Sequence, residues 1–411
     1  MTIVSERHIL VACHAWYGDM IGGAFRLATD FARDLAASGQ QVSYVCCATS
    51  PEAPRHEQQD GVRIYRYSPP PPEMAGVQKL MYHVRQTRAV VRSIHHVNRV
   101  HALSSHSPLQ GLGAAIALNR QAVFKNYTVH SPFDDELLSN LGPGGPTLLQ
   151  RLVGRAARWV DRRNIVLADR VQTVSRYTLQ NLQQKYGRCV TEKGVVAPGW
   201  VEADRFRPVP DRRALRSQLG EAWDTDKPLF FTLRRLEARM GLDTLIEACQ
   251  RLARDGVPFR TLIGGDGSQK KALQQMIDRA GLESNVRLLG RLPEDRLAAA
   301  YASADCFVLP TRALECFGLI VLEAFACDTP VIASSVAAIP ELAERQGREW
   351  MFEPGHVDEL SQRLSDFAAG ALRPTIDLRA TALEFDKPKV LQSWQRLIMD
   401  EAAVSSCAAG F

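Results

Sequence analysis

Short apolar runs alternate with helical patterns along most of the chain, and this alternation is the strongest constraint on its fold. The run HILVAC at 8–13 precedes a helical pattern at 26–37, and the extended run QVSYVCC at 41–47 follows it. This order has β-α-β spacing. Strands that are separated by helices form parallel sheets with both faces covered, so the sequence predicts the α/β fold class.

The alternation is interrupted once, at residues 197–212, where three prolines and interspersed charges break every period. Before this point, the run VRIYRY, a helical pattern near 78–98 and a strand ending at Val129 extend the first series. After it, helices separate strands expected at 228–233, 259–265, 286–290, 304–310 and 330–334. We predict two Rossmann-like doubly wound domains, residues 1–197 and 198–384, facing a central cleft in which ligands bind.

Composition excludes several classes of protein. Of the 411 residues, 45% are hydrophobic and 23% charged, which excludes a disordered chain or a low-complexity scaffold. The net charge of +5 permits an anionic partner without naming one. No window reaches 18 apolar residues and the N-terminus lacks a secretory pattern, so we expect a cytoplasmic protein.

The nine cysteines show no spacing typical of a metal or redox site. Their number is odd, and the chain has no C-x-x-C pair and no Cys/His ligand pattern. We therefore expect them to be small buried hydrophobic residues, and we predict no metal site.

Two turns are candidates for binding an anion. Gly22 and Gly23 fall at the expected start of the first helix, where free backbone N–H groups and the helix dipole favour a diphosphate. A plain strand-to-helix turn is the alternative. In the second series, Arg234 and Arg235 follow the first strand, and arginine forks at a strand end suit a diphosphate. The alternative there is a solvated basic loop.

The most specific element is a pair of carboxylates eight positions apart, Glu315 and Glu323. The glycine-bearing turn between them opens a helix, so Glu323 lies about one and a half turns inside it and Glu315 stays in the preceding loop. Carboxylates at a strand end accept hydrogen bonds from sugar and ribose hydroxyls. Surface glutamates with no ligand are the alternative.

His130 follows the strand that ends at Val129. A histidine at a strand end can donate to a phosphate or a sugar hydroxyl, and a satisfied structural histidine is the alternative. The acids Asp134, Asp135 and Glu136 come next and are expected to begin a helix rather than hold a metal.

Two segments carry many arginines. Residues 79–101 hold Lys79, Arg85, Arg88, Arg92 and Arg99 without an acid, and their apolar residues fall near helical spacing. Such a helix can lie on an anionic membrane, or it can be an outer Rossmann helix with a solvated face. A second cluster, with the same two interpretations, comprises Arg151, Arg155, Arg158, Arg162 and Arg163. No aromatic residues interleave as in a nucleic-acid groove, so we expect no nucleic-acid partner.

Taken together, these elements resemble the retaining family 4 glycosyltransferases of the GT-B fold over nearly the whole chain. The segments RRLEARMGLDTLIEA, LIGGDG and ECFGLIVLEAFACDTPVIAS are similar to successive signatures of that family, including its E-x7-E motif. The segment PGWVEADRFRP is similar to its passage into the second domain. Residues 385–411 are similar to the helix that crosses back to the first domain. The resemblance implies that the first domain binds an acceptor and the second a nucleotide-sugar donor.

The resemblance also implies residue roles. His130 would lie near the reacting sugar, Glu315 would face the hydroxyls of the donor sugar, and Arg235 would neutralise the diphosphate; these three form the expected catalytic set. Glu323 would bind the ribose. The expected donor-binding set is Gly22, Gly23, Arg234, Arg239, Gly241, Gly265, Phe317, Gly318, Leu319 and Glu323.

The implied reaction moves a sugar from a UDP- or GDP-sugar to an acceptor hydroxyl with retained anomeric configuration. In a front-face mechanism the leaving diphosphate takes the acceptor proton, so the protein positions the substrates and stabilises charge, and no cofactor or metal is required. The acceptor would be a saccharide, a lipid-linked sugar or a small metabolite. First-domain loops near 15–25, 68–80 and 130–146 would select it.

Three residues depart from the family pattern. Met240 stands where many members have lysine, Asp328 where glycine is usual, and Trp200 where a small residue is common. The change at Met240 removes one cation from the diphosphate unless Arg234 or Arg239 supplies it. It motivates one alternative, a catalytically silent nucleotide-sugar-binding protein. A GT-B epimerase or phosphorylase-type enzyme is the other alternative.

Overall fold

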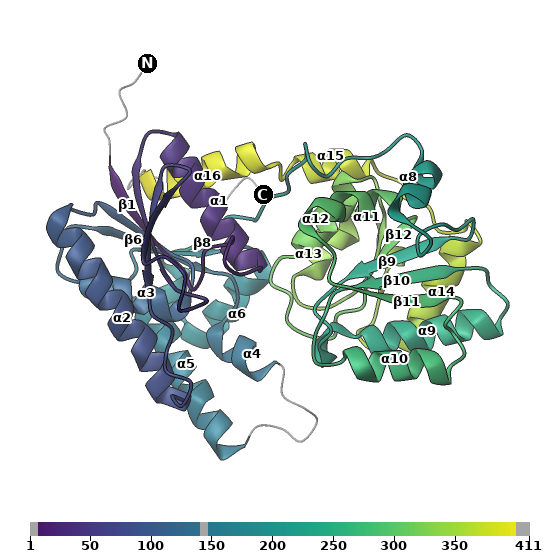
Figure 1. Cartoon of the computed structure of the whole chain (residues 1–411), viewed down its shortest axis with the longest axis horizontal. Helices are drawn as coiled ribbons and strands as arrows, with labels where there is room; N and C mark the ends of the chain where they lie inside the picture. Colours follow the sequence, from purple (N-terminus) through teal and green to yellow (C-terminus); the bar gives the residue numbers. More distant parts are fainter. Residues whose placement is uncertain (1–6, 140–146, 400–411) are drawn as a thin grey trace. The chain divides into compact units, whose positions relative to one another are not determined.

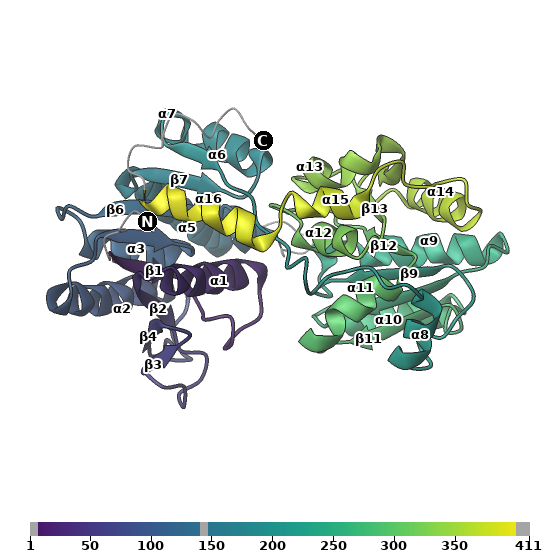
Figure 2. The ribbon, with the colours of Figure 1, turned by 90° about the horizontal axis from the view of Figure 1, so that it is seen from above.

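Two sheets, each with helices on both faces, organise the protein (Figures 1 and 2). The computed structural model describes residues 7–139 and 147–399. Within them the chain divides into two units. Unit 1 comprises residues 7–138, 147–199 and 390–399, and unit 2 comprises Ser139 and residues 200–389.

The eight strands of unit 1 follow the order β3-β4-β2-β1-β5-β6-β7-β8. All neighbours pair in parallel except β3, which pairs antiparallel with β4 at the edge. Without β3 and β8 this is the Rossmann order, which reverses between β1 and β5. The strands are β1 (His8–Ala12), β2 (Gln41–Cys47), β3 (His56–Gln59), β4 (Val62–Tyr67), β5 (Ala102–Ser105), β6 (Phe124–Val129), β7 (Arg170–Thr173) and β8 (Gly194–Val196).

Helices pack on both faces of this sheet (Figures 1 and 2). On one face α2 (Gly76–Val97) packs against α3 (Pro108–Ala117), which also packs against α5 (Leu148–Leu167); on the other face α1 (Gly23–Ala37) lies beside α16 (Lys387–Met399). The remaining helices of unit 1 are α4 (Phe133–Leu138), α6 (Arg176–Tyr186) and α7 (Arg188–Thr191).

Local chemistry sets the start of α5. Thr147 is its N-cap, and the Thr147 hydroxyl accepts from the Gln150 amide while the Gln150 side chain accepts from the Thr147 amide. This capping box satisfies two backbone donors that the helix itself leaves free.

Unit 2 contains six parallel strands in the order β11-β10-β9-β12-β13-β14, which reverses between β9 and β12. One core cluster lies between the sheet and α9, α10 and α14, and includes Phe230, Leu245 and Ile263. The strands are β9 (Leu229–Leu233), β10 (Arg260–Gly264), β11 (Val286–Gly290), β12 (Cys306–Leu309), β13 (Val331–Ser334) and β14 (Met351–Phe352). The α-helices are α8 (Arg212–Leu219), α9 (Leu242–Arg254), α10 (Lys270–Arg279), α11 (Leu297–Ser303), α12 (Leu319–Ala326), α13 (Ile339–Ala343), α14 (Val357–Ala368) and α15 (Leu378–Leu383).

The predicted α/β class with two doubly wound sheets is confirmed, and the strands expected in the second half end within two residues of the observed ones. The expectation of purely parallel sheets was wrong at β3, an exposed edge strand. The expectation that all cysteines are buried was wrong for Cys189, which is exposed, and for Cys316, which is half-buried. Cys407 and residues 140–146 lie outside the described residues, as does the part of the expected 385–411 helix beyond residue 399.

The last helix, α16, completes the core of unit 1. Trp394 is buried, its ring packs edge-on against Phe31 and stacks on His106, and its Nε1 donates to the Pro198 carbonyl at 2.9 Å. The Arg170 guanidinium donates to the Leu397 carbonyl beside it. Unit 1 is therefore built from segments on both sides of unit 2 in the sequence.

We expect Trp394→Ala to destabilise unit 1 by about 3 to 5 kcal/mol, because it removes a fully buried aromatic ring and leaves a cavity. Urea unfolding followed by circular dichroism measures the change. Trp159→Ala is the matched control, since Trp159 is 51% exposed, and its effect should stay within about 0.5 kcal/mol. Equal stability of the two variants would contradict this account of α16.

Candidate functional site

The polar side chains of unit 2 gather where its strand order reverses. Ligands of open parallel sheets bind at the carboxyl ends of the strands at such a point. Arg234 directly follows β9, and Glu315 lies in the loop between β12 and α12. The fold thus brings together two residues that are 81 positions apart in the chain.

The Arg234 cluster consists of Arg234, Met240, Thr311 and Glu315. One terminal nitrogen of Arg234 lies 2.9 Å from Glu315 Oε2, 3.0 Å from Thr311 Oγ1 and 3.0 Å from Met240 Sδ. The Arg234 side chain is only 8% exposed, and its Nε has no hydrogen-bond partner among the described residues. A buried guanidinium with an unused donor is suited to bind an anion.

The loop before Glu315 is held in an unusual conformation. Leu314 has a φ of 56°, in the left-handed region that a leucine rarely adopts. The Arg239 guanidinium donates to the Leu314 carbonyl at 2.7 Å, and the Ala338 amide donates to the Glu315 carbonyl at 3.0 Å. Arg239 thus fixes the backbone that presents Glu315.

The second carboxylate, Glu323, is buried one turn inside α12. Burial and the nearby Glu323 carboxylate raise the pKa of the Tyr301 hydroxyl well above its ordinary value, whereas the Arg234 guanidinium acts in the opposite direction. Glu323 and Arg234 therefore lie close to the same hydroxyl. Gly318, with a φ of 91°, caps α12, and Leu319 begins it, so the first backbone N–H groups of this helix lack a partner within it.

Two glycines of the expected site allow close packing beneath it. A Cβ on Gly241 would lie 1.9 Å from the Pro310 carbonyl oxygen, and a Cβ on Gly265 would lie 1.8 Å from the Arg234 carbonyl oxygen. Both have positive φ, so no other residue fits without moving the backbone. Phe317 is buried and packs on Phe385. Arg235, by contrast, is exposed.

In unit 1 the strand order reverses between β1 and β5, and histidines follow these strands. His106 Nδ1 lies 3.1 Å from His130 Nε2, and His106 Nε2 lies 2.9 Å from Ser104 Oγ. Burial lowers the pKa of His130 to about 4, and burial together with His130 lowers that of His106 well below its ordinary value. The three residues form a chain of neutral hydrogen-bonding groups ending at His130.

A second chain lies next to it. Tyr67 is 2.9 Å from His83 Nδ1 and accepts from Gln110 Nε2 at 2.6 Å, and Gln110 lies 3.3 Å from His14 Nδ1. We refer to these four residues with Ser104, His106 and His130 as the histidine network. Gly22 caps α1, and Gly23 is its first residue, as expected.

Sequence reasoning identified His130 but missed the other members of the histidine network. The signal was present for His14, Tyr67 and His106, because each stands at or just beyond the carboxyl end of a predicted strand. It was absent for His83 and Gln110, which lie inside helices α2 and α3.

The acidic residues 134–136 have a structural role. They lie in α4, as expected, and Asp134 forms ion pairs with Lys185 at 2.9 Å and Arg158 at 3.0 Å. Across residues 7–139 and 147–399, no group of three His, Cys, Asp or Glu side chains is arranged to hold a metal ion. Over the same residues, no helix has the length and apolar character needed to cross a bilayer.

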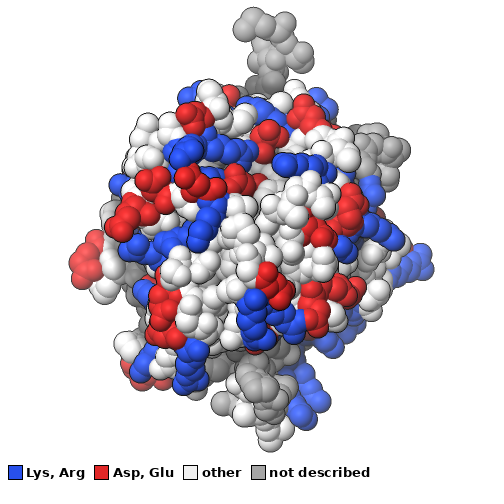
Figure 3. Space-filling model, turned by 90° about the vertical axis from the view of Figure 1, so that its right-hand side faces the viewer, with Lys and Arg blue, Asp and Glu red and all other residues white. Residues whose placement is uncertain are grey.

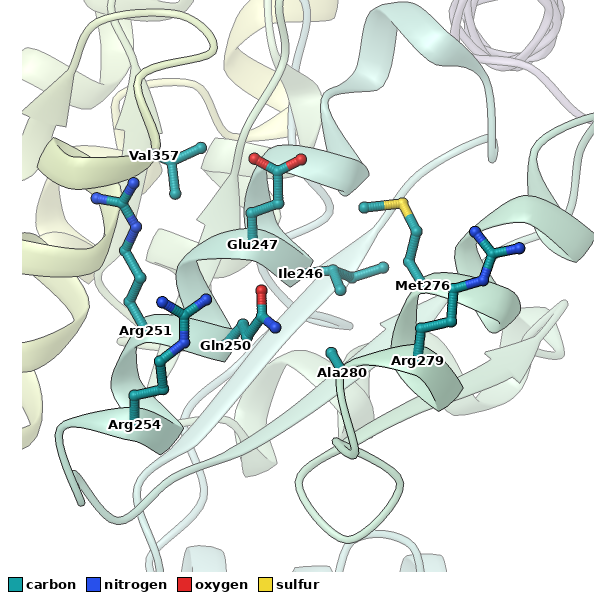
Figure 4. Close-up of a pocket in the computed structure, with 9 residues that line it drawn as sticks. All are labelled: Ile246, Glu247, Gln250, Arg251, Arg254, Met276, Arg279, Ala280 and Val357. Carbon is teal, nitrogen blue, oxygen red and sulfur yellow. The ribbon is translucent and has the colours of Figure 1, made fainter.

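A separate hollow lies on the outer side of unit 2 between α9, α10 and α14 (Figure 4). Ile246, Met276 and Val357 form its apolar floor, and Arg254 and Arg279 stand at its edge. It is lined by the later turns of α9 and α10, whereas the Arg234 cluster lies by the first turn of α9. The hollow is therefore distinct from the Arg234 cluster.

Two Rossmann-like units with polar groups at both reversal points define the GT-B class of protein. Two family models match consecutive parts of the chain: Glycosyltransferase Family 4 over residues 21–205, and Glycosyl transferases group 1 over residues 215–374. The chain belongs to the family 4 glycosyltransferases.

Two curated relatives at more than 30% identity match about half of the chain. It is 32% identical over 213 residues to the GDP-mannose-dependent alpha-(1-6)-phosphatidylinositol monomannoside mannosyltransferase of Mycolicibacterium smegmatis, covering 50% of this chain and 54% of the relative. It is 34% identical over 211 residues to the D-inositol 3-phosphate glycosyltransferase of Streptomyces bingchenggensis, covering 49% and 45%. The chain thus spans about half the length of these relatives.

Solved structures match over nearly the whole chain. Sucrose-phosphate synthase from Thermosynechococcus elongatus has a TM-score of 0.80 at 20% identity, covering 95% of this chain and 98% of that one. Anabaena HepE in complex with UDP has a TM-score of 0.72 at 19% identity, covering 95% and 99%. At this identity the likeness establishes the shared fold.

We expect the histidine network to make stability depend on pH. The pKa of His130 is about 4 in the folded chain and about 6.5 when unfolded, so the unfolded chain binds more protons between these values. Stability therefore falls as the pH decreases from 6.5 towards 4, and His130 accounts for about 2 kcal/mol between pH 7 and pH 5. His130→Gln should flatten the pH dependence of urea unfolding. Exposed His96→Gln should leave it unchanged, and equal slopes for both variants would contradict the prediction.

Proposed function

We propose that the protein is a hexosyltransferase that moves a sugar from a nucleotide diphosphate sugar to an acceptor hydroxyl. The observation that carries this proposal is the Arg234–Glu315 pair at the strand reversal of unit 2, in a chain of the glycosyltransferase family. A cation and a carboxylate side by side match a donor whose diphosphate is anionic and whose sugar offers hydroxyl groups.

Each member of this site would bind a different part of the donor. Arg234 and the backbone N–H groups at the start of α12 would hold the diphosphate and stabilise the charge that develops on it as the sugar leaves. Glu315 would accept hydrogen bonds from the sugar, and Glu323 from the ribose. Arg235, which is exposed, would approach the diphosphate from the solvent side.

We propose further that transfer retains the anomeric configuration and needs no metal ion. Glu315 is ion-paired with Arg234 at 2.9 Å, so it is suited to orient the sugar rather than to attack it. The leaving diphosphate can take the acceptor proton, and His130 would contact the reacting sugar from unit 1. UDP- and GDP-sugars are the candidate donors, because the mannosyltransferase relative is named GDP-mannose-dependent and HepE was solved with UDP.

The silent-binder alternative rested on Met240, which replaces the lysine common in the family. The terminal nitrogen of Arg234 lies 3.0 Å from the Met240 sulfur, so a cation is present where a lysine at 240 would bring one. Arg239 is held by the Leu314 carbonyl instead. This arrangement favours the enzyme over the silent binder, and nothing in the site favours an epimerase or a phosphorylase.

The acceptor is proposed to be a saccharide, a lipid-linked sugar or a small metabolite. The proposal includes a cytoplasmic location with peripheral contact to an anionic membrane. The helix expected to make that contact, α2, buries Val84, Val91 and Ile94 in unit 1 and leaves Arg85 and Arg92 exposed. α2 therefore offers charge to a membrane along its length, whereas its exposed large apolar side chains, Val77 and Val97, lie only at its two ends.

We expect Arg234→Gln to weaken binding of UDP or GDP about 10- to 100-fold, because it removes a charged hydrogen bond from a buried site. Isothermal titration calorimetry measures the affinity. Arg234→Gln/Met240→Lys should regain most of it, since the lysine returns a cation to the same place. Arg254→Gln is the matched control, because exposed Arg254 lies at the hollow of Figure 4. Unchanged affinity in Arg234→Gln would remove Arg234 from the site.

We expect Glu315→Ala to slow sugar transfer, or donor hydrolysis without acceptor, about 100-fold while UDP or GDP still binds. A panel of UDP-, GDP-, ADP- and dTDP-sugars, with and without magnesium, provides the assay, and thermal shift reports binding. NMR of the product reports its anomeric configuration.

Exposed Glu283→Ala serves as the control for this experiment and should keep the wild-type rate. A wild-type rate in Glu315→Ala would overturn the catalytic proposal. Binding of a nucleotide sugar without turnover in the wild type would favour the silent binder.

A further inference from the structure

The outward face of α5 carries large apolar side chains. Ten large hydrophobic side chains are exposed among the described residues, and four of them lie on this one helix. They are Leu148 at 76% exposure, Leu152 at 47%, Trp159 at 51% and Val166 at 45%. A gathering of exposed apolar side chains marks a surface that binds a partner.

These four residues share a straight stripe with two arginines. Steps of four and three residues alternate along it, which keeps every member on the same side of a helix. The stripe is Leu148, Leu152, Arg155, Trp159, Arg162 and Val166. At 1.5 Å per residue it is about 27 Å long. The opposite side of α5 packs into unit 1 through Ala157, Val160 and Ile165.

All charges on the exposed side of α5 are positive. They come from Arg151, Arg155, Arg158, Arg162 and Arg163, which are exposed. Arg158 is paired with Asp134 at 3.0 Å, whereas Arg155, Arg162 and Arg163 form no ion pair with any described residue.

The single acid of the helix faces inward. Asp161 is fully buried and accepts hydrogen bonds from the Tyr127 hydroxyl and the Phe133 amide, both at 2.7 Å. No carboxylate of α5 therefore offsets the arginines at the surface. The face of the protein in Figure 3 differs, because acidic and basic side chains alternate there over a largely uncharged background.

We propose that the outward face of α5 docks on an anionic lipid bilayer. Leu148, Leu152, Trp159 and Val166 would enter the boundary between headgroups and acyl chains, and the arginines would reach sideways to lipid phosphates. Tryptophan is suited to this depth because its ring is apolar and its N–H is polar. The proposal rests on the peripheral membrane contact that the proposed function includes, to which it assigns a surface, and it does not depend on the assigned reaction.

Charge favours a bilayer over a second copy of the chain. A symmetric dimer through this face would set the same row of arginines against itself without a carboxylate on α5 to separate them. An anionic bilayer supplies negative charge and an apolar layer at adjacent depths, which matches a stripe that mixes leucine, tryptophan and arginine. The neighbouring helix α2 adds exposed Lys79, Arg85 and Arg92 (Figure 1).

Co-sedimentation of the full chain with vesicles tests the apolar part of the proposal. Wild type should pellet with phosphatidylcholine–phosphatidylglycerol vesicles at 7:3 and not with phosphatidylcholine alone. Leu152→Ala/Trp159→Ala should bind the mixed vesicles at least tenfold more weakly. Leu383→Ala is the control, since Leu383 is 42% exposed on α15 of unit 2, and it should bind like wild type.

The charged part needs a separate set of variants. Arg155→Gln/Arg162→Gln/Arg163→Gln should bind mixed vesicles at least tenfold more weakly and lose most of the salt dependence. Arg254→Gln/Arg279→Gln/Arg373→Gln removes the same charge from exposed sites in unit 2 and should change binding less than twofold. Lipids with brominated chains should quench wild-type fluorescence more than that of Trp159→Phe, which reports insertion of this ring.

Three results would overturn the proposal. The first is equal vesicle binding by wild type and Leu152→Ala/Trp159→Ala. The second is an equal loss in the two arginine triple variants, which would reduce the effect to overall charge. The third is a concentration-dependent dimer in light scattering that only Leu152→Ala/Trp159→Ala dissociates, which would assign α5 to self-association. Thermal shift with UDP and GDP should match wild type in every variant, so failure here leaves the enzyme proposal standing.

Discussion

The reversal of strand order in each parallel sheet is the constraint on which the rest of the structure depends. Because all strands of unit 2 point the same way, β9 and β12 deliver Arg234 and the Glu315 loop to one edge, and helices that start there add their free N–H groups. The same geometry in unit 1 assembles the histidine network after β1, β4, β5 and β6. Polar and charged side chains gather at these edges because apolar core residues already fill both faces of each sheet.

The alternation of apolar runs and helical patterns was enough to predict both sheets and five of the six strands of unit 2, and it missed only the two-residue β14 there. It could not predict β3, because that strand is short, exposed and polar, and its pairing with β4 is set by the tertiary fold rather than by periodicity. The spacing correctly predicted the places of Glu315, in the loop before α12, and of Glu323, inside that helix, while their roles stay a prediction. The pairing of Glu315 with Arg234 could not be predicted, since it joins residues from separate strand ends.

The sequence also could not tell which of two neighbouring arginines, Arg234 or Arg235, points into the site. Sequence alone gives Arg234 and Arg235 equal standing, and the resemblance favoured Arg235 for the diphosphate. In the fold they alternate as strand-end residues do, so Arg234 turns inward to Met240 and Glu315 while Arg235 is exposed. Arg239, a third candidate, holds the Leu314 carbonyl. Side-chain direction, which a motif does not encode, separates the arginine that contacts Glu315 from the one that holds the loop before it.

The position of α16 has a consequence for the order in which the protein forms. Unit 1 needs Trp394 against Phe31 and His106, yet these residues are separated by the whole of unit 2. On the ribosome, unit 2 can fold as soon as its residues emerge, whereas unit 1 must wait with an open core until α16 is made. The surroundings of His106, and through it of His130, are thus completed only after α16 has been made. A chain that is cut short before α16 would retain every residue of the histidine network without the packing that sets its geometry.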